Sequence, residues 1–122
     1  MKTLCLRVFT KFLATTTALT ALLCTSTPWA RADEAAYLIN VTVRPGYNFA
    51  NAGAALNYGH GICDKISRGL PYGWIMSDIK ADFGTTDEYQ ASYLITQSAN
   101  ELCPALIWQL RNSAARYRPP GG

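Results

Sequence analysis

The first 32 residues have the pattern of an export signal, and this pattern limits what the rest of the chain can fold into. Three basic residues open the segment: Lys2, Arg7 and Lys11. An apolar stretch over residues 12–23 follows, then Pro28 and the small-x-small sequence Ala30-Arg31-Ala32. These are the parts of a secretory signal peptide. We therefore expect cleavage after Ala32, and a mature protein that begins at Asp33 and is secreted or held in the cell envelope.

Two other interpretations of this segment are a retained membrane anchor and a lipid-attachment site at Cys24. The apolar stretch is about 12 residues long and contains four threonines, whereas a membrane-spanning helix needs about 20 mostly apolar residues. Leu23 precedes Cys24, where a lipid-attachment signal has a small residue. Cleavage is therefore the favoured interpretation, and it leaves the mature protein without a stable transmembrane anchor.

Removal of the leader changes the charge of the protein. The whole chain has eleven Lys and Arg residues, eight Asp and Glu residues and a formal net charge of +3. Four of the basic residues and none of the acidic ones lie in the first 32 residues, so the mature part has a net charge of −1. We therefore expect no nucleic-acid binding, because that activity depends on basic residues that neutralise phosphates.

Two of the four cysteines, Cys63 and Cys103, remain after cleavage. In an oxidising compartment two cysteines permit one pairing within the chain, so we expect a Cys63–Cys103 disulfide. A cross-link that closes a loop of about 40 residues restricts the unfolded chain and contributes roughly 4 kcal/mol to stability. This contribution is comparable with the whole net stability of a small domain.

The spacing of apolar residues predicts an all-α fold, a small bundle of about four helices over residues 33–104. The first predicted helix covers residues 33–42, although its β-branched end is also typical of a strand. Apolar residues three and four apart predict a second helix over residues 51–68, which carries Cys63, and a third over residues 71–83.

The clearest helix start is predicted at Thr85. Thr85 as N-cap and Glu88 three residues later have the spacing of a capping box, and apolar residues follow at helical spacing as far as Cys103. Pro104 lacks an N–H group and interrupts this fourth helix. Residues 105–122 are predicted to be a C-terminal extension that is helical as far as Tyr117 and disordered after it.

Three glycines mark features of the second predicted helix. Gly59 and Gly61 each cost about 1 kcal/mol relative to alanine inside a helix. They therefore indicate the close approach of a neighbouring helix, or a break in this one. Gly69 is suited to a C-terminal cap, and Pro71 after it to the start of the next helix.

Several of these residues together resemble a known family. They are Gly59, Cys63, Ile66, Gly69, Gln90-Ala91 and the run Asn100-Glu101-Leu102-Cys103-Pro104. Over residues 33–104 the chain resembles the small secreted family catalogued as domain of unknown function 732, which is abundant in mycobacteria. The resemblance implies an all-helical, disulfide-linked secreted domain, and it brings no established activity, cofactor or catalytic residue. Residues 38–46 are more β-branched than in this family, and residues 105–122 extend beyond its usual end.

The sequence points to no catalytic, metal or cofactor site. His60 is the only histidine, and no Gly-x-Ser-x-Gly motif surrounds a serine. With both thiols in a disulfide, too few ligands remain for a closed zinc site. Tyr58 and His60 are haem-ligand types, but residues two apart on a helix do not face each other. Asp78 and Asp82 are expected on a solvated helix face.

We therefore predict a non-enzymatic module that binds an unknown protein or envelope component. Four aromatic residues in loops or at helix starts form the candidate contact patch: Tyr47, Phe49, Tyr72 and Trp74. The alternative is a carrier of an apolar ligand, lipid or haem, in a pocket between helices. The basic cluster of Arg111, Arg116 and Arg118 is expected to lie on a solvated tail.

Overall fold

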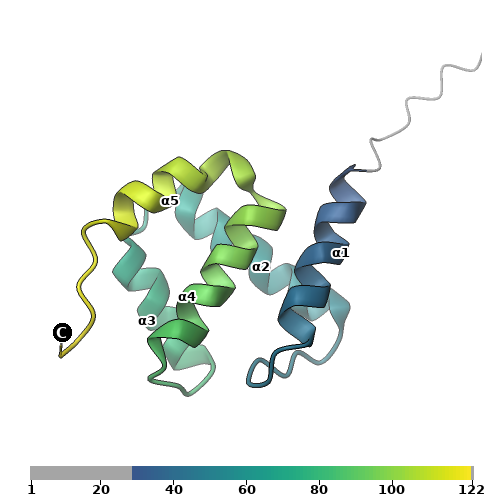
Figure 1. The fold of residues 1–122 in the computed structure, drawn as a ribbon, viewed down its shortest axis with the longest axis horizontal. Coiled ribbons are helices and arrows are strands. Elements are labelled where there is room, and N and C mark those ends of the chain that lie inside the picture. Colours follow the sequence, from purple (N-terminus) through teal and green to yellow (C-terminus); the bar gives the residue numbers. More distant parts are fainter. Residues whose placement is uncertain (1–28, 122) are drawn as a thin grey trace, which may run out of the picture.

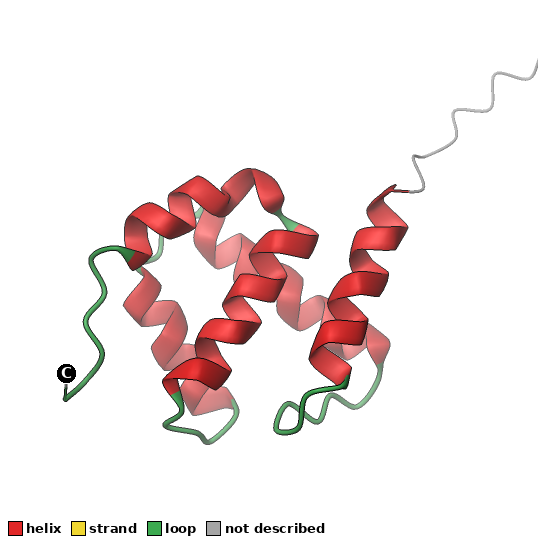
Figure 2. Cartoon of the chain, in the orientation of Figure 1, coloured by secondary structure: helices red, strands yellow, loops and turns green. Residues whose placement is uncertain are grey.

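The computed structural model describes residues 29–121, and over this range the chain is all-helical with no strand (Figure 2). The predicted signal segment up to Pro28 lies outside the described residues. The elements follow in the order α1 (Trp29–Thr42), α2 (Ala52–Ser67), α3 (Tyr72–Asp82), α4 (Glu88–Gln97), a π-helical segment (Ser98–Leu102), a 3-10 turn (Pro104–Leu106) and α5 (Ile107–Ala114). The prediction of an all-α fold is confirmed.

The helices pack around one core. In Figure 1, α4 lies between α3 and α1, α2 passes behind α4 and α1, and α5 crosses the upper end of the bundle. The π-helical segment that continues α4 packs against both α1 and α2. The core side chains are mostly aliphatic, and most of them come from the first four helices: Tyr37, Val41, Ala55, Ile62, Ile66, Ile75, Met76, Ile79, Ala91, Leu94 and Ile95. No helix within residues 29–121 is both long enough and apolar enough to cross a membrane.

The β-branched end of α1 is helical rather than extended. Val41 is buried in the core, and this burial of apolar surface stabilises the helical conformation. Thr42 donates its hydroxyl proton to the carbonyl of Leu38 at 2.7 Å, one helical turn earlier. Tertiary burial therefore outweighs the strand preference of the segment.

Gly59 lies where three elements meet. A Cβ atom at Gly59 would be 2.6 Å from the Tyr37 ring of α1 and 2.6 Å from Leu102. The hydroxyl of Tyr37 donates to the carbonyl of Ala55 at 3.0 Å, so its ring is fixed against α2. Burial raises the pKa of Tyr37 to about 12. The expected close approach is confirmed for Gly59 and wrong for Gly61, where the same atom would meet nothing within 4 Å.

The turn between α2 and α3 follows the prediction. Gly69 has a positive φ of 79°, a conformation that favours glycine. Its N–H donates to the Ile66 carbonyl at 2.9 Å and the Leu70 N–H donates to the Lys65 carbonyl at 3.1 Å. This pair of bonds is the Schellman arrangement. It redirects the chain so that Pro71 precedes the first residue of α3.

The predicted capping box at Thr85 is wrong. The N-cap of α4 is Asp87, whose carboxylate accepts from the Tyr89 N–H at 2.8 Å. Thr85 instead accepts from the N–H of Asp87 at 3.1 Å. Glu88 does not reach back to the helix start, because its carboxylate binds Lys80 and Tyr117 from other parts of the chain. Both oxygens of this carboxylate are thus already engaged in charge-assisted bonds to other side chains.

The predicted Cys63–Cys103 disulfide is present. It joins the middle of α2 to the residue that follows the π-helical segment. The Cys103 N–H donates to the Ser98 carbonyl at 3.3 Å and closes the π turn, and Pro104 ends the helix there. Three apolar residues then pack against the core: Leu106, Ile107 and Leu110. The last helix ends at Ala114, three residues before the predicted end.

The contrast between the two glycines of α2 gives a stability prediction. Gly59→Ala is expected to lower the free energy of unfolding by about 1–3 kcal/mol, because the new methyl group overpacks the contact with Tyr37 and Leu102. Gly61→Ala is the matched control on the same helix. It is expected to raise stability by up to about 1 kcal/mol, since alanine has the higher helix propensity. Urea unfolding followed by circular dichroism measures both, and equal effects of the two variants would contradict the packing.

Candidate functional site

The four aromatic residues predicted as a contact patch do not form one surface. Tyr47 is only 4% exposed, and its hydroxyl donates to the Gln90 carbonyl at 2.6 Å. Burial raises the pKa of Tyr47 to about 12. Phe49 is half-buried and packs in an aromatic cluster with Tyr47, Tyr58 and Phe83. Both residues therefore serve the interior, and Tyr47 offers no contact surface.

The other two members of the predicted patch lie on α3. Trp74 is 68% exposed. Tyr72 is half-buried and meets Tyr117 edge to face, with ring centroids 5.2 Å apart. Tyr117 was not predicted as a site residue. The pair of tyrosines marks the place where the C-terminal extension returns to the domain.

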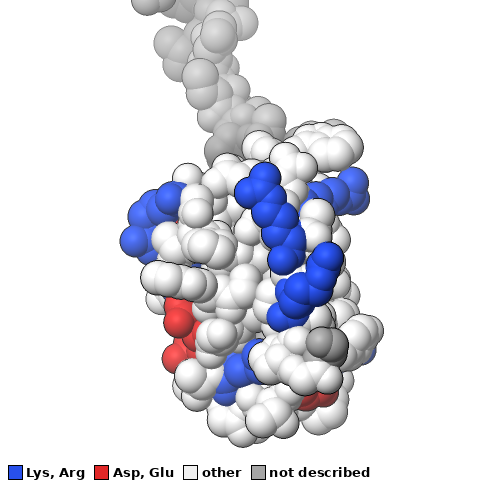
Figure 3. Space-filling view, turned by 90° about the vertical axis from the view of Figure 1, so that its left-hand side faces the viewer, with Lys and Arg blue, Asp and Glu red and all other residues white. Residues whose placement is uncertain are grey.

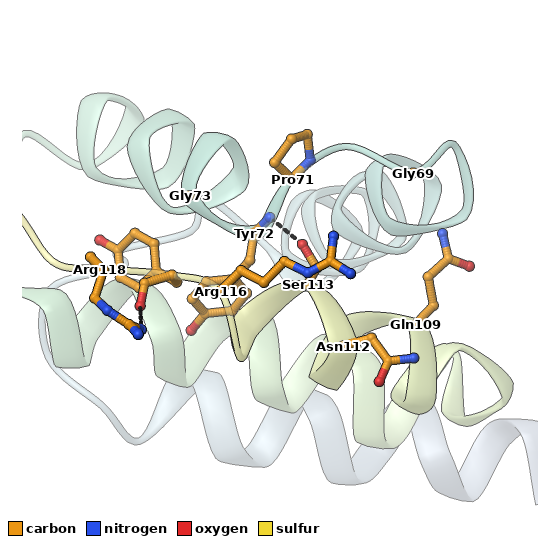
Figure 4. Close-up of a pocket in the computed structure, with 10 residues that line it drawn as sticks. Gly69, Pro71, Tyr72, Gly73, Gln109, Asn112, Ser113, Arg116 and Arg118 are labelled. Carbon is orange, nitrogen blue, oxygen red and sulfur yellow. Dashed lines mark hydrogen bonds between the residues drawn. The ribbon is translucent and has the colours of Figure 1, made fainter.

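An open groove of about 490 Å³ lies beside this pair (Figure 4). It runs along the start of α3, one face of α5 and the segment after α5. We call it the α3–α5 groove. Its lining residues are Gly69, Pro71, Tyr72, Gly73, Gln109, Asn112, Ser113, Arg116, Tyr117 and Arg118. Asn112 and Ser113 of α5 lie three and four residues after Gln109, so all three share one helix face.

Two polar side chains of α5 hold the walls of the groove in place. Pro71 precedes α3 and provides no side-chain cap. The Ser113 hydroxyl supplies one from α5 by accepting the Tyr72 N–H at 2.7 Å, the bond drawn in Figure 4. The Gln109 amide donates to the Ile66 carbonyl at the end of α2. The extension thus satisfies polar groups at both helix ends that meet in the α2–α3 turn.

A second hollow of about 340 Å³ lies on the other side of the tyrosine pair. Its lining residues are Tyr72, Met76, Glu88, Tyr89, Ser92 and Tyr117. Tyr72 and Tyr117 line both spaces, so their rings separate the second hollow from the α3–α5 groove. The two spaces therefore adjoin at Tyr72 and Tyr117.

A hydrogen bond to the Glu88 carboxylate holds Tyr117 against the domain. The carboxylate accepts from the Lys80 ammonium group and, through the other oxygen, from the Tyr117 hydroxyl at 2.7 Å. The bond from Lys80 and then the bond from Tyr117 hold the pKa of Glu88 below its ordinary 4.5. The same carboxylate raises the pKa of Lys80 above 10.5. Burial, and then the bond to Glu88, raise the pKa of Tyr117.

Basic residues accompany the groove. Figure 3 shows Lys and Arg side chains spread over this side of the molecule, with Asp and Glu side chains in its lower half. Arg116 and Arg118 line the groove, and both are exposed. Arg111 does not line it, because its guanidinium group lies over the Trp108 ring, 5.5 Å from the centroid. The predicted basic cluster is therefore divided between two places.

The other candidate residues are dispersed. His60 is exposed, with its Nε2 atom 3.7 Å from a carboxylate oxygen of Glu34. Asp78 accepts from Lys65 at 2.8 Å and Asp82 accepts from Tyr58 at 2.7 Å, and both acids are exposed as predicted. Within the described residues, no group of three His, Cys, Asp or Glu side chains is placed to hold a metal ion.

Most of the described domain matches one known protein family. The family described as "protein of unknown function (DUF732)" matches residues 32–105, more than half of the chain. The chain belongs to the DUF732 family. No curated protein and no solved structure matches it. The DUF732 match ends before α5, so the family domain supplies Tyr72, Gly73 and Glu88, while Ser113 and Tyr117 come from outside it.

The Glu88 network of this DUF732 protein predicts a pH dependence. The pKa of Glu88 is lower in the folded chain, so its contribution to stability is present above about pH 4.5 and lost as the pH falls through the lowered value. Glu88→Gln is therefore expected to lower the melting temperature at pH 7 and to have a smaller effect at pH 3.

The matched control for this experiment is Glu101→Gln, which removes the same charge from the π-helical segment and leaves the network intact. Differential scanning calorimetry of the three proteins between pH 3 and 7 makes the comparison. A Glu88→Gln effect that is the same at both ends of this range would contradict the assigned role of the carboxylate.

Proposed function

We propose that the chain is an exported, non-enzymatic binding module that recognises a protein or an envelope component through the α3–α5 groove. The observation that carries this proposal is the lining of the groove. It combines two tyrosine rings, amide and hydroxyl side chains and two arginines. Tyrosine and arginine are the residue types that dominate binding hot spots, because they offer large contact areas and hydrogen bonds together.

The charge of the groove favours an anionic group on the ligand. Its ten lining residues, all within the described chain, include Arg116 and Arg118 and no acidic residue. Guanidinium groups bind carboxylates and phosphates through paired hydrogen bonds. We therefore propose that the recognised surface carries carboxylate or phosphate groups next to an aromatic or apolar part.

The space beneath the groove is too small for the alternative function, the carrier of an apolar ligand. The cavity lined by residues of α2, α3 and α5 beneath the groove measures about 40 Å³. Ligand pockets for small molecules are typically about 300–1,000 Å³. Lipid or haem would require these helices to separate, whereas the groove accepts a ligand as it stands.

Export is the second part of the proposal, and the leader pattern supports it. The DUF732 match begins at residue 32, next to the proposed cleavage site after Ala32. The domain of the family therefore begins where the proposed mature protein begins. Cleavage there removes the first residues of α1 and leaves Tyr37 and Val41, which anchor this helix in the core.

Export gives a direct prediction. The full-length chain with a C-terminal tag, produced in a bacterial host that secretes proteins, is expected to be found outside the cytoplasm with Asp33 as its first residue. Intact-mass spectrometry of the purified protein measures the cleavage site. A protein that retains Met1, or one that stays in the cytoplasm, would contradict this part of the proposal.

The groove gives a binding prediction. The immobilised mature chain is expected to retain a component from the culture filtrate or cell wall of its producer, and mass spectrometry of protein and lipid fractions identifies it. Arg116→Ser with Arg118→Ser is expected to weaken retention by about tenfold per arginine, since bonds to charged groups contribute about 1.5–3 kcal/mol each.

Arg111→Ser is the matched control, because Arg111 lies over Trp108 and does not line the groove. It removes one positive charge from α5, a few residues before the two groove arginines, and is expected to leave retention unchanged. Equal losses for the control and the groove variant would mean that general charge, rather than the groove, holds the ligand.

A further inference from the structure

The segment after α5 is attached to the domain at a single residue. Tyr117 is half-buried, whereas every other residue from 115 to 121 is exposed. The hydrogen bonds of its neighbours stay within the segment or reach only to the end of α5. A tail held at one side chain can leave the surface without disturbing the core.

The surface beneath Tyr117 has a contact for the ring of the tyrosine and another for its hydroxyl group. The Tyr72 ring meets the Tyr117 ring edge to face, at an interplanar angle of 68°. The backbone at Gly73 allows close approach, since a Cβ atom there would lie 3.2 Å from the Tyr117 ring. Glu88, fixed by Lys80, accepts the phenolic proton at 2.7 Å. We call this surface the tyrosine slot.

The slot and its occupant belong to different parts of the chain. Tyr72, Gly73, Lys80 and Glu88 all lie inside the family match over residues 32–105, and Tyr117 lies outside it. The domain of the family thus contains the complete slot, and the extension of this chain fills it.

We propose that the tyrosine slot is a docking site for a tyrosine side chain on an extended segment of a partner protein, and that Tyr117 occupies it until the partner displaces it. This proposal deepens the proposed function, on which it rests for the idea of a partner. Removal of the Tyr117 ring joins the α3–α5 groove to the second hollow. The partner segment then lies along both, with its tyrosine in the slot.

The test uses the tail of the chain itself as the probe. A fluorescent peptide with the sequence of residues 113–122 is added to the full-length chain carrying Tyr117→Ala, in which the slot is vacant, and to the wild-type chain. Fluorescence anisotropy is expected to show binding to the variant at least tenfold tighter than to the wild type, where Tyr117 competes. Equal binding to both chains, or no binding to the variant, would overturn the slot.

Peptide variants test the chemistry of the slot. A peptide with phenylalanine in place of tyrosine is expected to bind the Tyr117→Ala chain about tenfold more weakly, because it lacks the bond to Glu88. Adding Glu88→Gln to the chain is expected to reduce this preference for tyrosine severalfold. An unchanged preference would contradict the assigned role of Glu88. Circular dichroism of each variant establishes that the helical fold is retained.

A second copy of the chain carries the same tail and is the other candidate occupant. Sedimentation equilibrium of the wild-type chain separates the two cases. A monomer supports a foreign partner, and a dimer that Tyr117→Ala abolishes would overturn the partner assignment in favour of tail exchange. These measurements do not depend on a captured ligand. The slot proposal can therefore fail while the groove still retains a ligand from the producer, and the groove can fail to retain one while the slot proposal holds.

Discussion

The disulfide between Cys63 and Cys103 is the constraint on which the C-terminal half of the structure depends. It fixes the end of the π-helical segment to the middle of α2, at the point where the helical ladder of α4 ends before Pro104. From this fixed point α5 starts and crosses the bundle. Without the cross-link, the extension would be held by the apolar contacts of Leu106, Ile107 and Leu110, the polar bonds of α5 and the contacts of Tyr117.

The position of α5 in turn creates the candidate site. Ser113 and Gln109 bond to the two helix ends at the α2–α3 turn, and Tyr117 reaches the slot formed by Tyr72 and Glu88. The groove therefore has one wall from the DUF732 domain and one from the extension. In this chain, the extension after the family domain forms one wall of the groove, and its Tyr117 side chain fills the tyrosine slot. This arrangement is suited to recognition that is regulated by displacement of the tail.

Much of the fold follows from local sequence patterns, and little of the site does. Apolar periodicity and Gly69 predict the helices and the α2–α3 turn, and the cysteine count predicts the disulfide. The capping box fails because Glu88 binds Lys80 and Tyr117, and the latter lies 29 residues away. Tyr47 is excluded from the predicted contact patch because it is buried and its hydroxyl bonds to α4, which a loop position does not reveal. The sequence did contain one signal for the site: Gln109, Ser113 and Tyr117 are spaced four residues apart, which is the spacing of one helix face.

Hydrogen exchange measured by mass spectrometry tests the central claim, that the cross-link holds the extension on the domain. The chain with its disulfide is compared with the Cys63→Ser, Cys103→Ser double variant under conditions in which both remain helical. The amides of α5 are expected to exchange faster in the variant, and to lose protection before those of α3 and α4. Protection of α5 that is the same in both proteins would contradict the account.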